Sequence, residues 1–329
     1  MKESLQNRCR LFVENRDRIK SEFKWETTYM YPLCAAMYTA EGIQADPSTM
    51  RACQKLLKQH TGVFSNFRRA TMLSVVTKLS LSDDPEETVR GMLRVYGELK
   101  ELFYGSPYLA IAAVTIAQLA SPDRQTEIVQ RTRTIYNRMK AVHPFLTSGE
   151  DSAFAALLAL SGLDDLRIEE EMEACFNLLK PSFFSGDAVQ SLSHILALGE
   201  STAQQKCGRV MALFDYLKDN GYRYGTSFEL PTLGSLALLN PEVSEIGDQM
   251  ISVDAYLKEH KGFGAWGIGS KQRLMYAGML TMDEYLPAPS AIQTAAVSSV
   301  ISLVIAQQAV LSAAIVTSAA ASASSSSSN

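Results

Sequence analysis

Acidic, amide and basic side chains occupy corresponding places in the later part of the chain. Asp151, Glu229 and Gln272 fall in one column when the sequence is aligned on its internal repeat. The basic pair Lys271 and Arg273 stands on either side of Gln272, and together with the nearby carboxylates it could form a mixed-charge funnel for an anionic small molecule. The candidate ligand-binding residues are Trp25, Glu26, Arg68, Glu150, Asp151, Gln190, His194, Glu229, Trp266, Lys271, Gln272 and Arg273.

Each of these residues also has a purely structural interpretation. Asp151 and Glu229 stand at predicted helix starts, where a carboxylate stabilises the helix dipole by ~0.3 to 1 kcal/mol. His194 lies in an apolar segment, which is typical of a hydrogen-bonded core histidine. The two tryptophans could anchor loops on the scaffold. The sequence therefore assigns no catalytic residue and leaves enzymatic activity undecided.

Charge and cysteine content exclude several classes of function. The 329 residues contain 31 Lys and Arg against 35 Asp and Glu, without the basic cluster that nucleic-acid binding requires. The four histidines show no helical i, i+4 pair, and the five scattered cysteines form no C-x-x-C motif. No metal and no cofactor is therefore expected. A charged N-terminus without an apolar stretch predicts a cytoplasmic protein with free thiols.

A lysine recurs with a period of about forty residues, and a hydrophobic residue directly precedes it each time. The spacings are 38, 42, 40, 40, 38 and 40 residues. Positions one, five and eight residues before each lysine are mostly apolar, which predicts an amphipathic helix that ends near the lysine. The members of this lysine column are Lys20, Lys58, Lys100, Lys140, Lys180, Lys218 and Lys258.

An aromatic loop and a second, almost uncharged helix follow each lysine. The loops are rich in glycine and proline, and the segments after them include YLAIAAVTIAQLA and AFAALLALSGL. Residues 1–286 are therefore predicted to form an all-α domain of about seven tandem helical hairpins. A closed α/α toroid with the second helices inside is slightly preferred over an open α-solenoid.

The chain changes character after residue 286, because residues 286–329 contain no charged side chain. We expect an uncharged hydrophobic helix over residues 287–318 and a disordered Ala/Ser tail over residues 319–329. Three glutamines and the lack of flanking Lys or Arg argue against a membrane span. Membrane association is therefore allowed but not favoured, and packing on the repeats or pairing of two protomers is preferred.

Several segments of the chain are distinctive and occur in a fixed order. They are NRDRIKSEFKWETTYMYPLCA, HPFLTSGEDSAFAALLAL, EACFNLLKP, AVQSLSHILALGE and KGFGAWGIGSKQRLMYAGML. On these segments the chain resembles a bacterial family of uncharacterised proteins, the domain of unknown function family numbered four thousand and three. The resemblance implies no activity. A looser similarity to α/α-toroid enzymes lacks their acidic motif, since Asp83, Asp84, Asp164 and Asp165 read as helix-start signals.

The sequence favours a helical-repeat protein that binds or processes a small ligand, which could be anionic, at the rim formed by the aromatic loops. Loops on a rigid scaffold are the usual place for function. The alternatives are a protein-protein interaction scaffold, or a membrane-associated factor held by the C-terminal helix. A homo-oligomer is compatible with either.

Overall fold

The structure is a computed structural model, and it describes residues 1–285 apart from residues 25, 69 and 266. The predicted C-terminal helix and Ala/Ser tail therefore lie outside the described residues. The described part contains fourteen α-helices and two short 3₁₀ segments and no strand, which confirms the all-α prediction. Among these residues no helix combines the length and the apolar character needed to cross a lipid bilayer.

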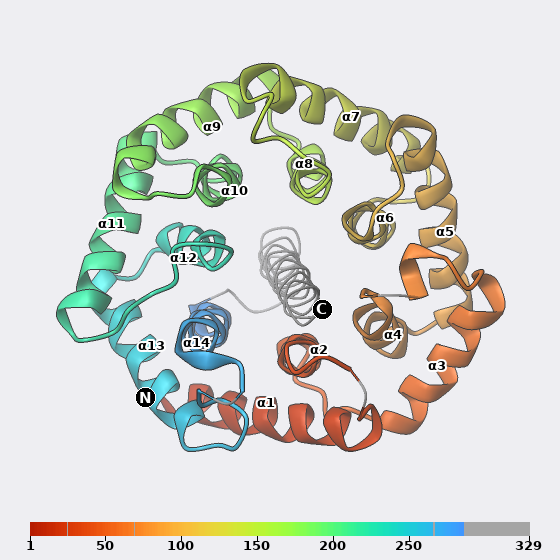
Figure 1. The fold of residues 1–329 in the computed structure, drawn as a ribbon, viewed down its shortest axis with the longest axis horizontal. Coiled ribbons are helices and arrows are strands. Elements are labelled where there is room, and N and C mark those ends of the chain that lie inside the picture. Colours follow the sequence, from red (N-terminus) through yellow and green to blue (C-terminus); the bar gives the residue numbers. More distant parts are fainter. Residues whose placement is uncertain (25, 69, 266, 286–329) are drawn as a thin grey trace, which may run out of the picture.

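The helices alternate between an outer and an inner layer (Figure 1). The outer helices are α1 (Glu3–Glu22), α3 (Pro47–His60), α5 (Pro85–Leu102), α7 (Gln125–Val142), α9 (Asp165–Leu179), α11 (Ala203–Asp219) and α13 (Val243–Lys258). The inner helices are α2 (Met30–Ala40), α4 (Met72–Ser80), α6 (Pro107–Leu119), α8 (Asp151–Leu160), α10 (Gly186–Leu196), α12 (Leu230–Ala237) and α14 (Gly269–Tyr285). The 3₁₀ segments are η1 (Asn66–Arg68) and η2 (Lys180–Ser182).

The lysine column marks the ends of the outer helices, as predicted. Six of the seven lysines lie in the last turn of their helix, and Lys180 directly follows α9. Several starts are capped by the residues that the sequence indicated: Asp84 accepts a hydrogen bond from the Glu87 amide, and Asp164 accepts from the amides of Leu166 and Arg167. The hairpin assignment is thus confirmed at both ends of its outer helices.

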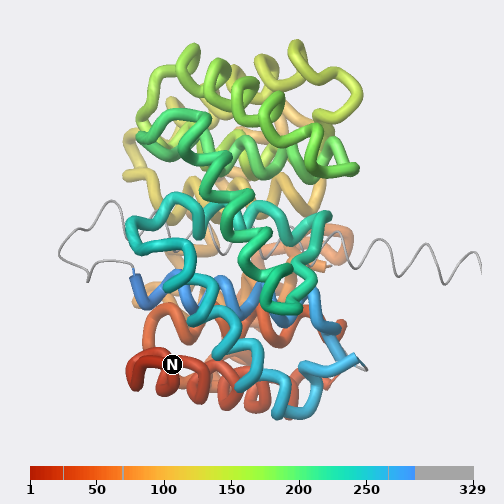
Figure 2. Tube along the Cα trace, turned by 90° about the vertical axis from the view of Figure 1, so that its left-hand side faces the viewer, coloured from red at the N-terminus to blue at the C-terminus, as the bar shows by residue number. Residues whose placement is uncertain are grey.

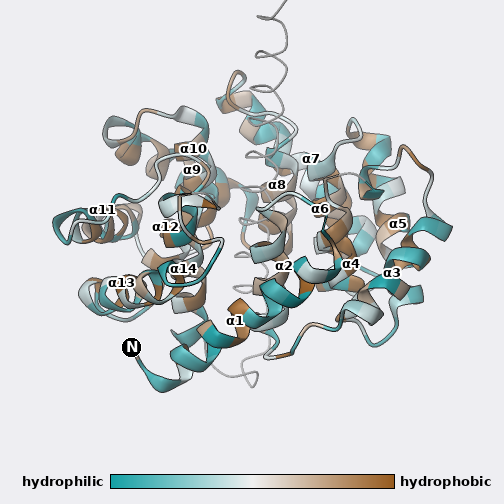
Figure 3. Cartoon of the chain, turned by 60° about the horizontal axis from the view of Figure 1, so that its bottom comes forward, coloured by the Kyte–Doolittle hydropathy of each residue, from teal (hydrophilic) through white to brown (hydrophobic). Residues whose placement is uncertain are grey.

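Hydrophobic patterning explains the two layers. The outer helices carry both hydrophilic and hydrophobic residues (Figure 3), whereas an inner helix such as α8 is buried from Asp151 to Ala159. All five free cysteines are buried, including Cys53 and Cys175 of the repeating apolar stripe. Five of the six pairs of consecutive inner helices pack side by side, all except α4 and α6. The loops that follow the outer helices emerge on one side of the array (Figure 1). We call that side the aromatic-loop rim.

The first and last hairpins meet. Helix α1 packs on both α13 and α14, and Figure 2 shows it beside them at one end of the view. The Phe12 ring lies 5.7 Å from the rings of both Phe263 and Tyr276, and Arg8 forms an ion pair with Asp283 at 3.4 Å. From these contacts we infer an α/α toroid in preference to an open solenoid.

Arginines on the outer helices secure the C-terminal ends of the inner helices. Arg209 of α11 donates hydrogen bonds to the carbonyls of Ala237, Leu239 and Pro241, at 2.7 to 2.9 Å. Arg131, which stands at the same distance before its column lysine, donates to the Ala159 and Leu163 carbonyls. These guanidinium groups satisfy carbonyls that a helix end leaves without intrahelical partners.

Replacing Arg209 with glutamine should lower the free energy of unfolding by about 2–3 kcal/mol, because bonds from a charged donor to three carbonyls are lost. Urea denaturation followed by circular dichroism measures the effect. The exposed Arg223 provides the matched control, and its replacement with glutamine should change stability by less than about 0.5 kcal/mol. Equal transition midpoints for the two variants would show that Arg209 contributes nothing to the end of α12.

Candidate functional site

Three of the predicted ligand-binding residues come together between α8 and α10. Asp151 opens α8, and its Oδ1 lies 3.7 Å from Nδ1 of His194. Gln190 lies one turn before His194 on α10 and donates a hydrogen bond to Thr147 Oγ1 at 2.9 Å. All three side chains are buried. The sequence placed them on two different hairpins, and the packing of neighbouring inner helices joins them.

The Asp151–His194 contact is not an ion pair. Burial raises the pKa of Asp151 to about 7, although the Ser148 amide donates a hydrogen bond to its Oδ2 at 2.7 Å and opposes the rise. Burial also lowers the pKa of His194 to about 3, helped by the nearby charge of His143. At neutral pH a neutral imidazole therefore faces a carboxyl group that is close to its own titration point.

Part of the hydrogen-bonding capacity of this cluster is unused by the protein. Within the described part of the chain, neither His194 Nδ1 nor Gln190 Oε1 has a hydrogen-bond partner. Both residues line a cavity of about 20 Å³ together with His143. Buried polar atoms of folded proteins are nearly always satisfied, so two such atoms in one cluster distinguish it from ordinary core packing.

Glu229 is engaged by its own loop. Its side chain folds back so that Oε2 accepts a hydrogen bond from the Ser227 amide at 3.2 Å. A Cβ atom at Gly225 would lie 2.1 Å from the Glu229 carboxyl carbon, so only glycine leaves room for this carboxyl group. Burial raises the pKa of Glu229, and the Lys271 charge opposes the rise. This geometry matches the structural interpretation of Glu229.

Arg273 is paired with a residue that sequence reasoning missed. Its guanidinium forms two hydrogen bonds with the Asp254 carboxylate, at 2.8 and 3.0 Å, and a third with the Phe263 carbonyl at 2.8 Å. Both charged side chains are buried. The neighbouring Gln272 is buried as well, whereas Lys271 is exposed. Arg273 therefore joins α14 to α13 and to the seventh loop.

The remaining predicted residues lie apart from that cluster or at its edge. Arg68 donates to the Lys58 carbonyl at 2.9 Å and so closes the end of α3. Burial raises the pKa of the half-buried Glu26. Glu150 accepts a hydrogen bond from the Tyr108 hydroxyl at 2.9 Å, next to Asp151. Trp25 and Trp266 lie outside the described residues. That all these positions serve one ligand stays a prediction.

A pocket adjoins the Asp151 cluster on the aromatic-loop rim. It has a volume of about 530 Å³ and lies between the third and fourth hairpins, and we call it the rim pocket. Its lining includes Gly149 and Ser152, which stand on either side of Asp151 in the sequence. The full lining is Lys100, Glu101, Leu102, Phe103, Tyr104, Gly105, Ser106, Leu109, Arg133, Tyr136, Gly149 and Ser152.

Two basic side chains that line the rim pocket, Arg133 and Lys100, have no carboxylate partner among the described residues. The Arg133 guanidinium lies over the ring of Phe103 at 4.9 Å and near that of Tyr136 at 5.6 Å, and these two rings meet edge to face. Among the described residues, neither Arg133 nor Lys100 forms an ion pair or a hydrogen bond through its charged group. Stacking on aromatic rings orients an arginine and leaves its N–H donors available to an anion.

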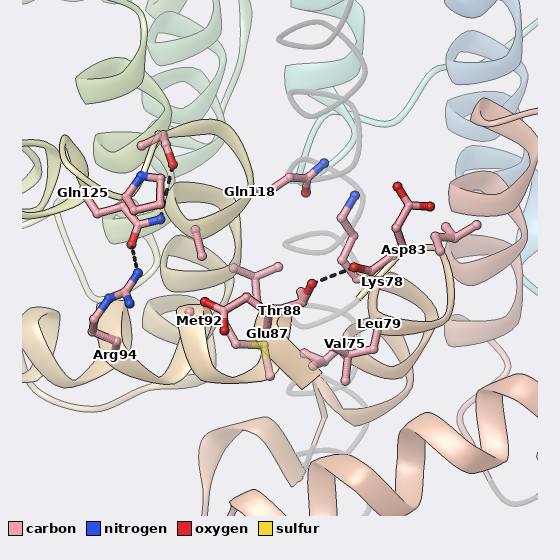
Figure 4. A pocket seen from close by; sticks show the side chains of 17 residues that line it. Val75, Lys78, Leu79, Asp83, Glu87, Thr88, Met92, Arg94, Gln118 and Gln125 are labelled. Atoms are coloured by element: carbon pink, nitrogen blue, oxygen red, sulfur yellow. Dashed lines mark hydrogen bonds between the residues drawn. The ribbon is translucent and has the colours of Figure 1, made fainter. Parts of the chain in front are cut away.

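A second cavity, of about 400 Å³, lies at the opposite rim between the second and third hairpins (Figure 4). Lys78 and Gln118 reach toward the same space there, and burial lowers the pKa of Lys78. The Lys78 ammonium has no hydrogen bond or ion pair in the part of the chain that the structure describes. Sequence reasoning missed this lysine, although its place in the apolar segment MLSVVTKLS was a usable signal.

The described residues contain no group of three or more His, Cys, Asp or Glu side chains arranged to hold a metal ion. The features that stand out are instead a ring-like array of helical hairpins, a buried carboxyl–imidazole contact and a basic pocket beside it. They define a helical-repeat protein with a candidate ligand site on its loop rim.

Comparison with known proteins agrees with the fold-level assignment. The chain belongs to the family described as Protein of unknown function (DUF4003), whose model matches residues 15–309. It is similar to the uncharacterized protein YeaA of Bacillus subtilis (strain 168), with 23% identity over 323 residues that cover 90% of this chain and 95% of that protein. No solved structure matches the chain. The family resemblance seen in the sequence is thus confirmed.

Proposed function

We propose that this protein binds a small anionic ligand in the rim pocket. The observation that carries the proposal is Arg133, a half-buried cation that is held over two aromatic rings with no carboxylate partner among the described residues. A guanidinium in this position offers several N–H donors in a fixed plane, which suits a carboxylate or a phosphate. Lys100 adds a second positive charge to the same lining.

The N-terminal ends of helices α6 and α8 also favour an anionic ligand in the rim pocket. The rim pocket is lined by Ser106, the N-cap of α6, and by Gly149 and Ser152 at the start of α8. Helix N-termini carry partial positive charge and favour anions. Asp151 places a carboxyl group with a pKa of about 7 next to the pocket, where it could exchange a proton with a bound ligand near neutral pH.

We also propose a cytoplasmic location, because all five cysteines are free thiols buried in the helical layers. The alternative function, an interaction scaffold for other proteins, gains no support from these features of the pocket.

Replacing Arg133 with glutamine should weaken anion binding by roughly tenfold or more, since charge-assisted hydrogen bonds contribute about 1.5–3 kcal/mol each. Inorganic phosphate, pyrophosphate, succinate and citrate are suitable probes. A ligand that binds the folded state raises the thermal midpoint with concentration. Calorimetric titration of the best probe then gives the affinities of the wild type and the variant.

Lys78→Gln is the matched control, because it removes a positive charge from the cavity at the opposite rim. We expect this variant to bind the probe like the wild type. If Lys78→Gln loses binding while Arg133→Gln keeps it, the anion site is the second cavity and the rim-pocket proposal is wrong. The proposal also fails if none of the four probes shifts the wild-type midpoint.

A further inference from the structure

Four aromatic side chains on the aromatic-loop rim stand almost entirely in solvent. The exposed fractions are 84% for Phe64, 99% for Tyr104, 99% for Phe145 and 100% for Phe184. They belong to the second, third, fourth and fifth loops, so each of four consecutive hairpins presents one. We call these residues the aromatic tips. A single exposed apolar residue is common on a protein surface, but here the exposure of an aromatic ring recurs in four consecutive loops on one side of the array.

Loop anchoring does not account for the aromatic tips, because other residues perform that role. Phe183 is buried and meets Phe214 edge to face at 5.3 Å, whereas the adjacent Phe184 is fully exposed. In the third loop Phe103 packs on Tyr136 in the same way, and Tyr104 points outward. In the second loop Phe67 is the buried anchor. Each of these loops thus pairs an anchored ring with an exposed one.

Lysines hold two of the loops in this conformation. The Lys140 ammonium donates hydrogen bonds to the carbonyls of Pro144 and Thr147, on either side of Phe145. The Lys180 ammonium donates to the carbonyls of Phe183 and Phe184, at 3.4 and 3.2 Å. The bonds order the loop backbone and keep a positive charge at the base of each aromatic tip.

The two rims differ in charge. Every lysine of the column reaches the end of its outer helix at the aromatic-loop rim. The six connectors at the opposite rim contain a single basic residue, Arg124. Their acidic residues are Glu41, Asp46, Asp83, Asp84, Asp123, Asp164, Glu200 and Glu242. Near a negatively charged surface, this distribution turns the aromatic-loop rim toward it.

We propose that the aromatic-loop rim, from the second to the fifth loop, docks on an anionic lipid bilayer. Phe64, Tyr104, Phe145 and Phe184 enter the interfacial layer, and the column lysines face the headgroup phosphates. Each aromatic tip projects from the loop of a different hairpin, so the four rings do not form one continuous patch. A bilayer accepts separate insertions, whereas a specific protein partner needs one continuous, closely packed patch.

This inference goes beyond ligand binding in the rim pocket, and the two surfaces share only Lys100 and Tyr104. Its test uses the full chain and the triple variant Phe64→Ser, Phe145→Ser, Phe184→Ser, which leaves the lining of the rim pocket unchanged. Sedimentation with vesicles of phosphatidylcholine containing about 30% phosphatidylglycerol measures binding. We expect the wild type to bind these vesicles, to bind pure phosphatidylcholine far less, and to dissociate in about 0.5 M salt. The triple variant should bind at least about tenfold more weakly.

The matched control is Leu166→Ser, which removes an exposed apolar side chain near the opposite rim and should bind like the wild type. A direct readout comes from Phe145→Trp, whose fluorescence should shift further to the blue than that of the wild type, with Trp25 and Trp266 alone, when anionic vesicles are added. Wild-type protein that does not sediment with anionic vesicles would overturn the proposal. So would a triple variant that binds as the wild type does, since residues 286–329 are intact in it.

Discussion

Arg273→Met should lower the free energy of unfolding by about 3–5 kcal/mol, because it leaves the buried Asp254 carboxylate without its partner. The exposed fractions of the two side chains are 9% and 4%, so the ion pair is largely removed from water in the folded protein. The variant also frees the Phe263 carbonyl, which accepts from Arg273 at 2.8 Å. Chemical denaturation at neutral pH gives the stability difference directly.

Two further variants make this prediction specific. Lys271→Met removes a positive charge two residues earlier in α14, from an exposed side chain, and should cost less than about 0.5 kcal/mol. The double variant Asp254→Leu, Arg273→Met should recover much of the lost stability, since an apolar pair needs no compensation of charge. If Arg273→Met is as stable as Lys271→Met, the buried pair does not hold the last hairpin together.

The Arg273 contact also affects the junction between the first and last hairpins. Phe263 packs on Phe12, and Arg16 of α1 lies over the Phe263 ring at 4.4 Å. Arg16 donates in addition to the Lys261 carbonyl at 2.6 Å. Disorder of the seventh loop in Arg273→Met should therefore spread to α1, and hydrogen exchange in α1 should become faster than in the wild type.

Asp151→Asn should become progressively more stable than the wild type as the pH rises from about 4 to about 8. Burial raises the folded-state pKa of Asp151 to about 7, with smaller contributions from Glu150 and Asp187, against about 3.9 in an unfolded chain. Because the folded-state pKa is raised, the protonated Asp151 contributes to the free energy of unfolding fully below about pH 4. This contribution is lost as the pH rises to about 7. A pKa difference of three units corresponds to a loss of at most about 4 kcal/mol in the free energy of unfolding of the wild type. The asparagine variant has no carboxyl group at this position and does not undergo this loss.

The wild-type profile alone will not reveal this effect, because His194 acts in the opposite direction. Its folded-state pKa is about 3, against 6.5 for an ordinary histidine, so its contribution is present above pH 6.5 and is lost as the pH falls toward 3. The two contributions overlap between about pH 4 and pH 6.5 and largely cancel there. Only the difference between the variant and the wild type isolates Asp151.

The exposed Asp215 of α11 serves as the control for Asp151, and Asp215→Asn should follow the wild-type curve at every pH. Thermal midpoints in a common buffer series between about pH 4 and pH 8 are sufficient. Parallel curves for Asp151→Asn and the wild type would show that the carboxyl group ionises in the folded protein as it does in water. In that case Asp151 could not supply a proton to the rim pocket near neutral pH.

The hairpin array follows from patterns that can be read along the amino-acid sequence. A forty-residue period with apolar positions one, five and eight residues before each lysine requires an amphipathic helix, and Lys20 to Lys258 lie at helix ends for that reason. Acidic starts such as Asp84 and Asp164 were equally readable, because capping depends on residues two or three positions apart. Helix periodicity and N-capping depend on residues close together in the chain, so a short segment is sufficient to predict each helix and its ends.

The contacts between polar residues depend instead on how the helices pack. Asp151 and His194 are 43 positions apart, and they meet because two inner helices pack side by side. Asp254 occupies the repeat position four residues before the lysine, where four other copies have Tyr or Phe, and this departure was a signal that sequence reasoning missed. Its pairing with Arg273 depends on the approach of α14 to α13.

The contacts between α1 and the last hairpin likewise join residues more than 240 positions apart. Hydrophobic periodicity selects which face of a helix is buried, and it does so without reference to the neighbour that covers that face. Partner choice is set by packing, hydrogen-bond geometry and desolvation across the completed array. Packing, hydrogen-bond geometry and desolvation are defined only when the hairpins lie against one another. For this reason the sequence predicted the hairpins and the ends of their helices but not the contacts between hairpins.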